Sequence, residues 1–277
     1  MTEENDSGLL EAVVGAGAAA LAPVITCCHP YVRGLANLPA DGRFLLVGNH
    51  TLFSMAEVVL IPYFVRTAIG TRVRPLADRQ FARMTGIQAA LVTAYGAVIG
   101  TPAAARRLMD EGESVLVFPG GAREISKYRG EEYTLSWQNR DGFARIAIEK
   151  EYPIVTVALV GGDDVYTSMV RRDSTLGRVG RWAGQRLTGR SDITMSPVRG
   201  VGLTLIPKPQ RMYLAFGQPI DTCRSPQTSV EAWTGAVKRR VQQDLEAALL
   251  DLQRIRATDP YRRMNPVGRS SAIPSPC

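Results

Sequence analysis

The sequence holds few of the residues on which several common kinds of protein chemistry depend. Its cysteines are Cys27, Cys28, Cys223 and Cys277, an arrangement that fits neither a disulfide framework nor a metal site and that indicates the reducing side of a membrane. Only two histidines are present, and aromatic residues make up 7% of the 277 residues. Because basic and aromatic residues do not alternate, a protein that binds single-stranded nucleic acid is disfavoured.

Several catalytic motifs are also missing from the sequence. It has no G-x-x-x-x-G-K-[ST] phosphate loop, no G-x-S-x-G nucleophile elbow and no H-E-x-x-H motif. The nearest approach to a dinucleotide fingerprint is Gly15-Ala16-Gly17, which lacks a third glycine and a preceding strand. These absences argue against a P-loop NTPase, a serine hydrolase of the nucleophile-elbow type and a zinc protease.

The composition is that of a folded chain with a basic surface. Apolar residues make up 45% and charged residues 21% of the sequence, and the length suffices to bury a core. The net charge of +7 suits anionic lipid headgroups, phosphate-bearing cofactors or nucleic acid, although a merely solvated basic surface explains it equally well.

The chain begins with an apolar segment, residues 12–28, which follows acidic rather than basic residues and therefore differs from a signal peptide. A spanning helix needs roughly 20 apolar residues. This segment is shorter, rich in alanine and glycine, and interrupted by Pro23. We expect residues 1–30 to form an apolar helix that packs on the domain or lies in a bilayer interface.

Strand and helix patterns alternate through the rest of the chain. Strands are expected at residues 43–48, 72–76, 114–118, 154–160, 202–206 and 211–216, and helices at 56–67, 102–111, 141–149 and 230–252. This order predicts an α/β fold, a sheet covered by helices, in a domain spanning residues 31–256. Ligands of such sheets bind beyond the strand ends.

Three further segments have more than one interpretation. The apolar stripe of residues 230–252 is typical of a helix packed on the core, and a membrane-bound basic helix is the alternative. Residues 169–199, with arginines interleaved among apolar residues, predict either a surface helix hairpin or a flap facing lipid or cofactor. Residues 257–277 are polar and rich in proline and serine, which predicts a flexible tail.

Two places at strand ends carry candidate chemistry. His50 directly follows the strand that ends in Gly48-Asn49, and histidine is the side chain best suited to proton transfer near neutral pH. A hydrogen-bonded structural histidine is the alternative. The second place is the Phe118-Pro119-Gly120-Gly121-Ala122-Arg123 turn, where glycines let backbone N–H groups approach an anion and the arginine offers a phosphate contact. A plain tight turn explains it equally well.

Taken together, residues 30–220 resemble the phospholipid/glycerol acyltransferase family, the PlsC-type lysophospholipid acyltransferases. The nearest branch holds plant phytyl-ester and diacylglycerol acyltransferases and related bacterial proteins. Four ordered blocks carry the resemblance. They are Gly48-Asn49-His50, Gly96 to Pro102, Phe118 to Arg123, and Tyr152 to Val157. The resemblance implies a central mixed sheet flanked by helices.

The blocks depart from the usual family pattern in places. Met55 stands where the family carries an aspartate five residues after the histidine, so the resemblance assigns the orienting carboxylate to Glu57. The second block lacks its usual arginine. Gly120 replaces a glutamate, and Glu124 lies just beyond the arginine.

The resemblance implies an O-acyltransferase that moves a fatty acyl group from acyl-CoA or acyl carrier protein to a lipid hydroxyl, such as that of diacylglycerol, a long-chain alcohol or a lysophospholipid. His50 would be the general base and Glu57 its partner. The substrate-binding residues would be Asn49, Gly96, Phe118, Pro119, Gly120, Gly121 and Arg123. No metal or cofactor is required. The expected partners are the acyl donor, the lipid acceptor and an anionic membrane surface on the cytoplasmic face, with no nucleic acid.

Two other functions remain open at this point. A thioesterase or lipid hydrolase would use the same histidine with water as the acceptor. A non-catalytic basic lipid-binding protein would depend on the arginines of residues 169–199.

Overall fold

The computed structural model describes residues 22–23, 25–52, 56–77, 96–188 and 196–276. Its main sheet has seven strands in the order β1-β9-β6-β2-β5-β3-β4. Neighbouring strands are parallel, except that β6 and β9 are antiparallel. The sheet is therefore mixed, as predicted. Its strands are β1 (Tyr31–Arg33), β2 (Leu45–Gly48), β3 (Val73–Ala77), β4 (Val98–Ile99), β5 (Ser114–Val117), β6 (Ile154–Val160) and β9 (Tyr213–Phe216).

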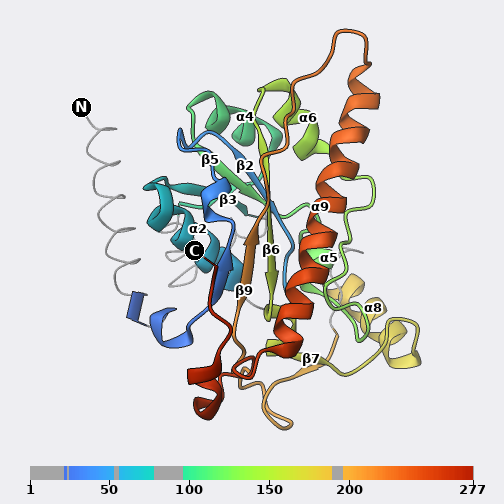
Figure 1. The fold of residues 1–277 in the computed structure, drawn as a ribbon. Helices are drawn as coiled ribbons and strands as arrows, with labels where there is room; N and C mark the ends of the chain where they lie inside the picture. Colours follow the sequence, from blue (N-terminus) through green and yellow to red (C-terminus); the bar gives the residue numbers. More distant parts are fainter. Residues whose placement is uncertain (1–21, 24, 53–55, 78–95, 189–195, 277) are drawn as a thin grey trace, which may run out of the picture.

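Helices cover both faces of this sheet (Figure 1). The helices are α2 (Ala56–Ile69), α4 (Pro102–Asp110), α5 (Ala122–Ile125), α6 (Gly142–Glu149), α7 (Gly162–Val165), α8 (Thr175–Thr188) and α9 (Val230–Thr258), with 3-10 turns η1 (Leu35–Asn37) and η3 (Pro266–Ser271). A separate two-stranded ribbon pairs β7 (Thr167–Ser168) with β8 (Val198–Arg199).

The central strands are buried on both faces, which explains their continuous apolar sequences. Leu45 and Val47 of β2 pack in one core with side chains of α4, α6 and α9. Leu46, between them, points to the other core, where it packs with α2. This alternation follows from the two-residue period of a strand. Each strand end is thereby held rigidly, and the loops that follow carry the site.

Most of the predicted elements are present within two residues of their expected ends. The apolar stripe of α9 packs on the sheet through Val237, Val241, Leu245, Leu249 and Leu252, so the core-packing interpretation holds. Residues 169–199 contain α8. The strand predicted at 202–206 is wrong, because these residues form a tight exposed loop instead.

The expected N-terminal apolar helix lies largely outside the described residues. Its last part, residues 25–28, is helical. Among the helices that the structure describes, none combines the length and the apolar character that crossing a bilayer requires.

The predicted flexible tail differs from the structure, in which residues 259–276 pack on the domain. Asp259 is fully buried and forms an ion pair with buried Arg211, at 2.5 Å. The hydroxyl of Tyr213 donates to the same carboxylate, at 2.5 Å. Near the end of the chain, Ser275 Oγ accepts a hydrogen bond from the N–H of Val32 in β1, at 2.9 Å. The polar composition of residues 257–277 gave no indication of these contacts.

Candidate active site

The loop that follows β2 is fixed to the neighbouring strand by Asn49. The side-chain amide of Asn49 donates to the carbonyl of Leu159 at 3.0 Å and its oxygen accepts from the N–H of Leu159 at 2.8 Å. Asn49 is buried, so these bonds form away from water. The structure therefore gives Asn49 a positioning role, and the next residue, His50, leaves the carboxyl end of the sheet in one defined direction.

His50 is paired with Glu57, the carboxylate in the first turn of α2. His50 Nδ1 hydrogen-bonds to Glu57 Oε1. The same carboxylate accepts from the backbone N–H of Thr51 at 2.9 Å and from the Thr51 hydroxyl at 2.6 Å. Glu57 is fully buried, whereas the His50 side chain keeps 13% of its surface exposed. The pair fixes the imidazole and leaves its Nε2 as the nitrogen available to a reactant.

The environment of Glu57 keeps it ionised. Burial alone would raise the pKa of Glu57, but the hydrogen bond and charge interaction with His50, together with the hydrogen bonds from Thr51, outweigh burial and lower its pKa. A fixed anion beside Nδ1 stabilises the imidazolium that forms when Nε2 takes up a proton. The pair is therefore suited to general-base catalysis.

Phe118 connects the imidazole to an apolar cavity. Its ring stacks on His50 with the ring centroids 4.7 Å apart and the planes inclined by 26°. This cavity has a volume of about 530 Å³, and Phe118 forms part of its wall. Its other apolar lining residues are Leu45, Leu76, Ala77, Pro102, Ala105, Met109, Val117, Pro119, Phe143 and Ile146. Small-molecule sites commonly measure roughly 300–1,000 Å³.

The turn after β5 lies beside His50 and is held by two charged side chains. Arg140 Nη1 donates to the carbonyl oxygens of Pro119 and Gly120, each at 3.0 Å. Glu124 Oε2 accepts from the backbone N–H of His50 at 2.8 Å. A Cβ at position 120 would overlap the Glu124 carboxyl group. A side chain at position 120, where the family usually carries a glutamate, would therefore displace the Glu124 carboxyl group from its contacts.

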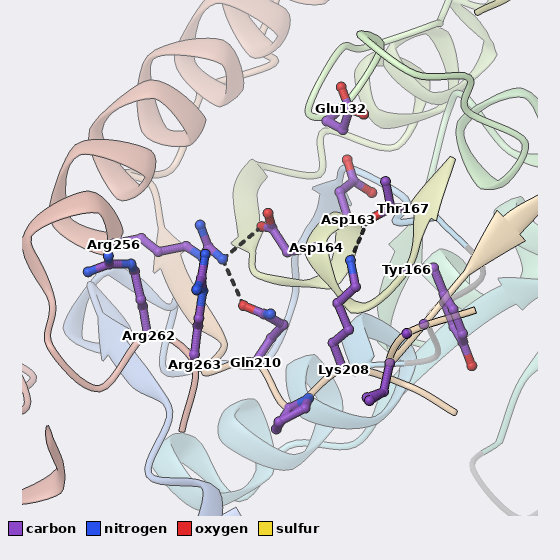
Figure 2. Close-up of a pocket in the computed structure, with 14 residues that line it drawn as sticks. Glu132, Asp163, Asp164, Tyr166, Thr167, Lys208, Gln210, Arg256, Arg262 and Arg263 are labelled. Carbon is purple, nitrogen blue, oxygen red and sulfur yellow. Dashed lines mark hydrogen bonds and ion pairs between the residues drawn. The ribbon is translucent and has the colours of Figure 1, made fainter. Parts of the chain in front are cut away.

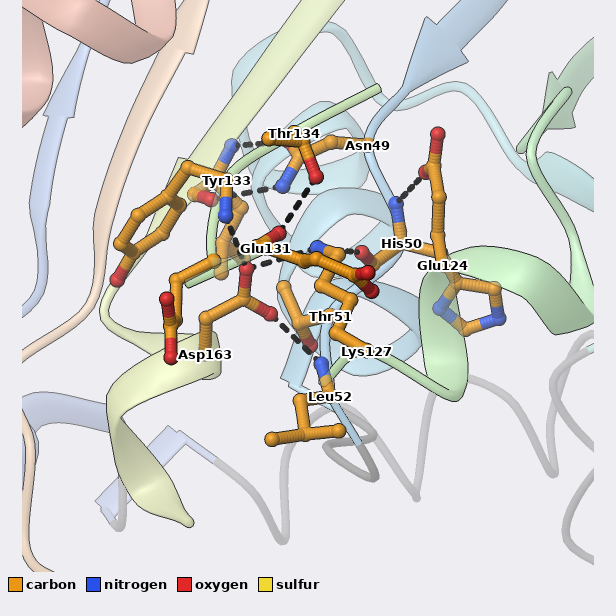
Figure 3. Close-up of polar contacts among 12 residues, drawn as sticks. Asn49, His50, Thr51, Leu52, Glu124, Lys127, Glu131, Tyr133, Thr134 and Asp163 are labelled. Atoms are coloured by element: carbon orange, nitrogen blue, oxygen red, sulfur yellow. Dashed lines mark hydrogen bonds and ion pairs between the residues drawn. The ribbon is translucent and has the colours of Figure 1, made fainter. Parts of the chain in front are cut away.

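A buried ion pair supports the same loop from below (Figure 3). Lys127 Nζ donates to the carbonyl of His50 at 2.8 Å and to Asp163 Oδ2 at 2.7 Å. Asp163 also accepts from the backbone N–H groups of Leu52 and Tyr133, each at 2.7 Å. Both charged side chains are almost fully buried. The backbone on either side of the catalytic candidate is thereby held by carboxylates from two other loops.

Two predicted site residues lie away from His50 or lack a defined partner. Gly96 precedes β4, and a Cβ there would overlap the guanidinium of Arg72, while its carbonyl accepts from Arg74 Nε at 2.9 Å. Gly100, at the other end of the same sequence block, lines the apolar cavity. Arg123 is half-buried on α5 and, among the residues that the structure describes, forms no ion pair.

The second cavity, of about 620 Å³, lies on the far side of α7 and is strongly polar (Figure 2). Arg256, Arg262 and Arg263 face Lys208 across it, and the carboxylates of Asp163 and Asp164 lie on its wall. Arg256 Nη2 is 3.3 Å from Asp164 Oδ2. Asp163 thus contributes both to the support of His50 and to this cavity.

The sequence interpretation assigned no role to Lys127, Asp163 or Arg140. Asp163 had a usable signal, since it follows the buried strand β6 and the glycines 161 and 162. Glu124 was noted only as lying past the arginine of the turn. Lys127 and Arg140 carried no local signal, because a buried lysine and a surface lysine look alike in one sequence.

Comparison with known proteins points to the same family as the sequence blocks. The sequence model of the family described as "Acyltransferase" matches residues 29–160. Phytyl ester synthase 1 of Arabidopsis thaliana is 29% identical over 256 residues, which cover 83% of this chain and 35% of the plant protein. Phytyl ester synthase 2 of the same plant is also 29% identical, over 88% of this chain and 38% of its own length. The chain therefore spans little more than a third of either plant relative.

A solved structure supports the fold. The crystal structure of the 1-acyl-sn-glycerophosphate acyltransferase PlsC from Thermotoga maritima superposes with a TM-score of 0.51 and 19% identity, covering 89% of this chain and 83% of that chain. The fold is therefore PlsC-like. Together, the family model, the plant relatives and this fold support the resemblance of the sequence blocks to the glycerolipid acyltransferase family.

Proposed function

We propose that this chain transfers a fatty acyl group from a thioester, acyl-CoA or acyl carrier protein, to the hydroxyl of a lipid, with His50 as the general base. The observation that carries the proposal is the contact of His50 with Glu57 on one side and Phe118 on the other. A fixed imidazole is thereby placed against the wall of an apolar cavity of about 530 Å³.

In the proposed reaction His50 Nε2 removes the proton from the acceptor hydroxyl as its oxygen attacks the thioester carbonyl. The tetrahedral intermediate then collapses, the carbon–sulfur bond breaks, and the imidazolium returns the proton to the leaving thiolate. Glu57 stabilises the imidazolium throughout. No covalent acyl-enzyme is needed, because the acceptor attacks directly.

Backbone N–H groups of the turn after β5 are the proposed donors to the oxyanion. The N–H of Gly121 already donates to the carbonyl of Phe118 at 3.0 Å. Among the described residues, the N–H of Gly120 donates to no protein acceptor, and it lies on the buried part of the turn. We therefore assign the oxyanion contact to Gly120. Arg123, on the helix that follows, is assigned to a phosphate of the donor.

The apolar cavity is assigned to an acyl chain, and we favour a neutral acceptor such as diacylglycerol or a long-chain alcohol. The second sequence block supports this preference, since Gly100 to Pro102 contribute to the cavity and the block holds no arginine. The enzyme would act at a membrane surface, where such acceptors reside.

The experiment incubates the purified chain with labelled acyl-CoA and a panel of lipid alcohols and identifies the products by mass. His50→Ala should lower turnover by roughly 10²–10⁴-fold while the chain remains folded. The matched control is His29→Asn, since His29 is the other histidine and its positive φ suits asparagine. Fully active His50→Ala protein would refute the mechanism. Acyl release to water alone would identify a hydrolase instead.

A further inference from the structure

Exposed apolar side chains are concentrated on two segments of the surface. Of the eleven large apolar residues exposed in the described part of the chain, eight lie between positions 169 and 206. They are Met169, Leu176, Val179, Trp182, Val201, Leu203, Leu205 and Ile206. Large exposed apolar surfaces commonly mark interaction sites in soluble proteins.

The two segments leave the fold side by side. β7 leads into α8 and β8 leads into the loop of residues 200–206, and the two strands pair through Thr167↔Arg199 and Ser168↔Val198. The N–H of Met169 continues the pairing by donating to the carbonyl of Pro197 at 2.8 Å. Figure 1 shows α8, in yellow, at the lower right and this loop, in orange, at the bottom of the molecule.

Part of the backbone of the 200–206 loop is hydrogen-bonded within the loop. The N–H of Gly200 donates to Thr204 O at 2.6 Å, that of Val201 to Ile206 O at 2.8 Å, and that of Thr204 to Val201 O at 3.1 Å. A Cβ at position 200 would overlap the Ile206 carbonyl oxygen, so the closure requires glycine. Leu203 is 82% exposed. These internal bonds lower the cost of moving the loop's backbone into an apolar medium, and the outward apolar side chains gain from that transfer.

The charge around these apolar residues is mainly positive. Residues 169–188 and 196–209 together contain one acidic residue, Asp173, and seven basic residues: Arg171, Arg172, Arg178, Arg181, Arg186, Arg199 and Lys208. Arg186 lies over the ring of Trp182, with 5.8 Å to the centroid. Gly200 and Gly202 also line the polar cavity, which brings Arg262 and Arg263 beside the loop together with the carboxylates of Glu132, Asp163 and Asp164.

The same surface is joined to the catalytic loop. Lys127, which donates to the carbonyl of His50, precedes Tyr128, whose hydroxyl donates to Gly177 O of α8 at 3.5 Å. Glu131 forms an ion pair with Arg172 at 2.5 Å. β6, which ends beside His50, runs through α7 into β7. The surface therefore lies at the carboxyl end of the sheet, the end that carries His50.

We propose that α8 and the 200–206 loop form a docking face for an anionic lipid bilayer. The apolar loop and the exposed side of α8 enter the boundary between headgroups and acyl chains, and the surrounding arginines and Lys208 contact lipid phosphates. Charge complementarity selects this occupant over a protein partner, because a face with seven basic residues and one acidic residue matches a surface of uniform negative charge. Docking by this face brings His50 close to a bilayer.

The test measures co-sedimentation of the full chain with phosphatidylcholine vesicles that contain or lack phosphatidylglycerol. Binding does not require turnover, so its result is independent of the proposed catalysis. The wild-type chain should bind the anionic vesicles more strongly and lose that preference in high salt. The double variant Leu203→Ser/Leu205→Ser should lower the partition coefficient by at least about tenfold. The double variant Arg178→Glu/Arg186→Glu should lower it by about fivefold for each arginine.

Matched controls lie on α9. Val230→Ser removes an exposed apolar side chain at the far end of that helix, and Arg239→Glu/Arg240→Glu makes the same change in net charge as the α8 variant. Both should bind like the wild type, and all variants should keep its unfolding midpoint. Equal binding by the loop variant and the wild type would overturn the proposal. So would sedimentation-velocity data in which the loop variant abolishes self-association, since the occupant would then be a second copy.

Discussion

The carboxylate of Glu124 occupies the space that a side chain at position 120 would need, so the two positions cannot both carry a large side chain. From that place Glu124 accepts from the N–H of His50 at 2.8 Å and from the N–H of Ser136 at 2.9 Å. Glu124 thus places a carboxylate beside the turn at Gly120, the position where the family usually carries a glutamate.

The first prediction concerns Gly120→Ala. The added methyl group should displace Glu124 and leave the N–H groups of His50 and Ser136 without their acceptor, at a cost of about 1–3 kcal/mol for each buried group. Urea unfolding should show the loss, and turnover should fall with it. Gly235→Ala, within α9, is the control and should stabilise the protein by up to about 1 kcal/mol. An unchanged stability of Gly120→Ala would contradict the packing.

The second prediction concerns the orienting carboxylate. Glu57→Gln keeps the size of the side chain and removes the charge beside His50 Nδ1, so turnover should fall by roughly 10²–10⁴-fold. The fall should appear in kcat more than in KM, since Glu57 is fully buried beneath the imidazole. Equal effects on KM and kcat would assign Glu57 to substrate binding instead.

The third prediction concerns acid stability. The pKa of Glu57 is lower in the folded chain than its ordinary value of 4.5, so its stabilising effect is complete above that pH and is lost as the pH falls through the folded pKa. Unfolding free energy measured from neutral pH downward should therefore fall less steeply for Glu57→Gln than for the wild type.

Glu124 supplies a control of opposite sign. Burial raises its pKa, and the charge of Lys127 offsets this only in part. The folded chain therefore takes up a proton on Glu124 before the unfolded chain does, and this uptake favours folding as the pH falls towards 4.5. As the pH falls, the free energy of unfolding should accordingly decrease more steeply for Glu124→Gln than for the wild type. Identical pH profiles for both variants would contradict the two shifts.

The fourth prediction concerns the buried pair of Lys127 and Asp163. Asp163→Asn leaves a buried ammonium group without its counter-charge, which costs about 3–5 kcal/mol. Denaturant unfolding should show a loss of this size. Lys150→Met, which breaks the more exposed ion pair with Asp110, should cost less than about 1 kcal/mol. Similar losses in the two variants would mean that burial does not set the cost.

The fold was largely predictable because its strands and helices have distinct apolar periods. The β6 sequence is continuously apolar since both faces are buried, and α9 shows a stripe at helical spacing. The strand predicted at 202–206 failed for an instructive reason. Leu203, Leu205 and Ile206 supply the apolar content of a strand, yet all three are exposed. The sequence shows that these residues are apolar, but not whether their side chains face the core or the solvent.

For the site, the sequence predicted which positions along the chain carry its residues, but not most of the contacts between them. His50 and the turn beginning at Phe118 follow strands, so their meeting at one sheet edge was foreseeable from topology. The contacts from Lys127 and Asp163 join residues 36 positions apart, and no spacing rule encodes such a pair. Glu57 came from the family resemblance, and its distance from His50 along the sequence alone did not fix it.

The last residues of the chain have a consequence for how this protein is handled. β1 is the outermost strand on its side of the sheet, and the Ser275 hydroxyl accepts from one of its amides. Removing residues 259–276 would unpair that amide and strip the buried guanidinium of Arg211 of its counter-ion. The shortened chain would then expose the unpaired edge of β1 next to the uncompensated charge of Arg211. Both changes favour intermolecular strand pairing and aggregation.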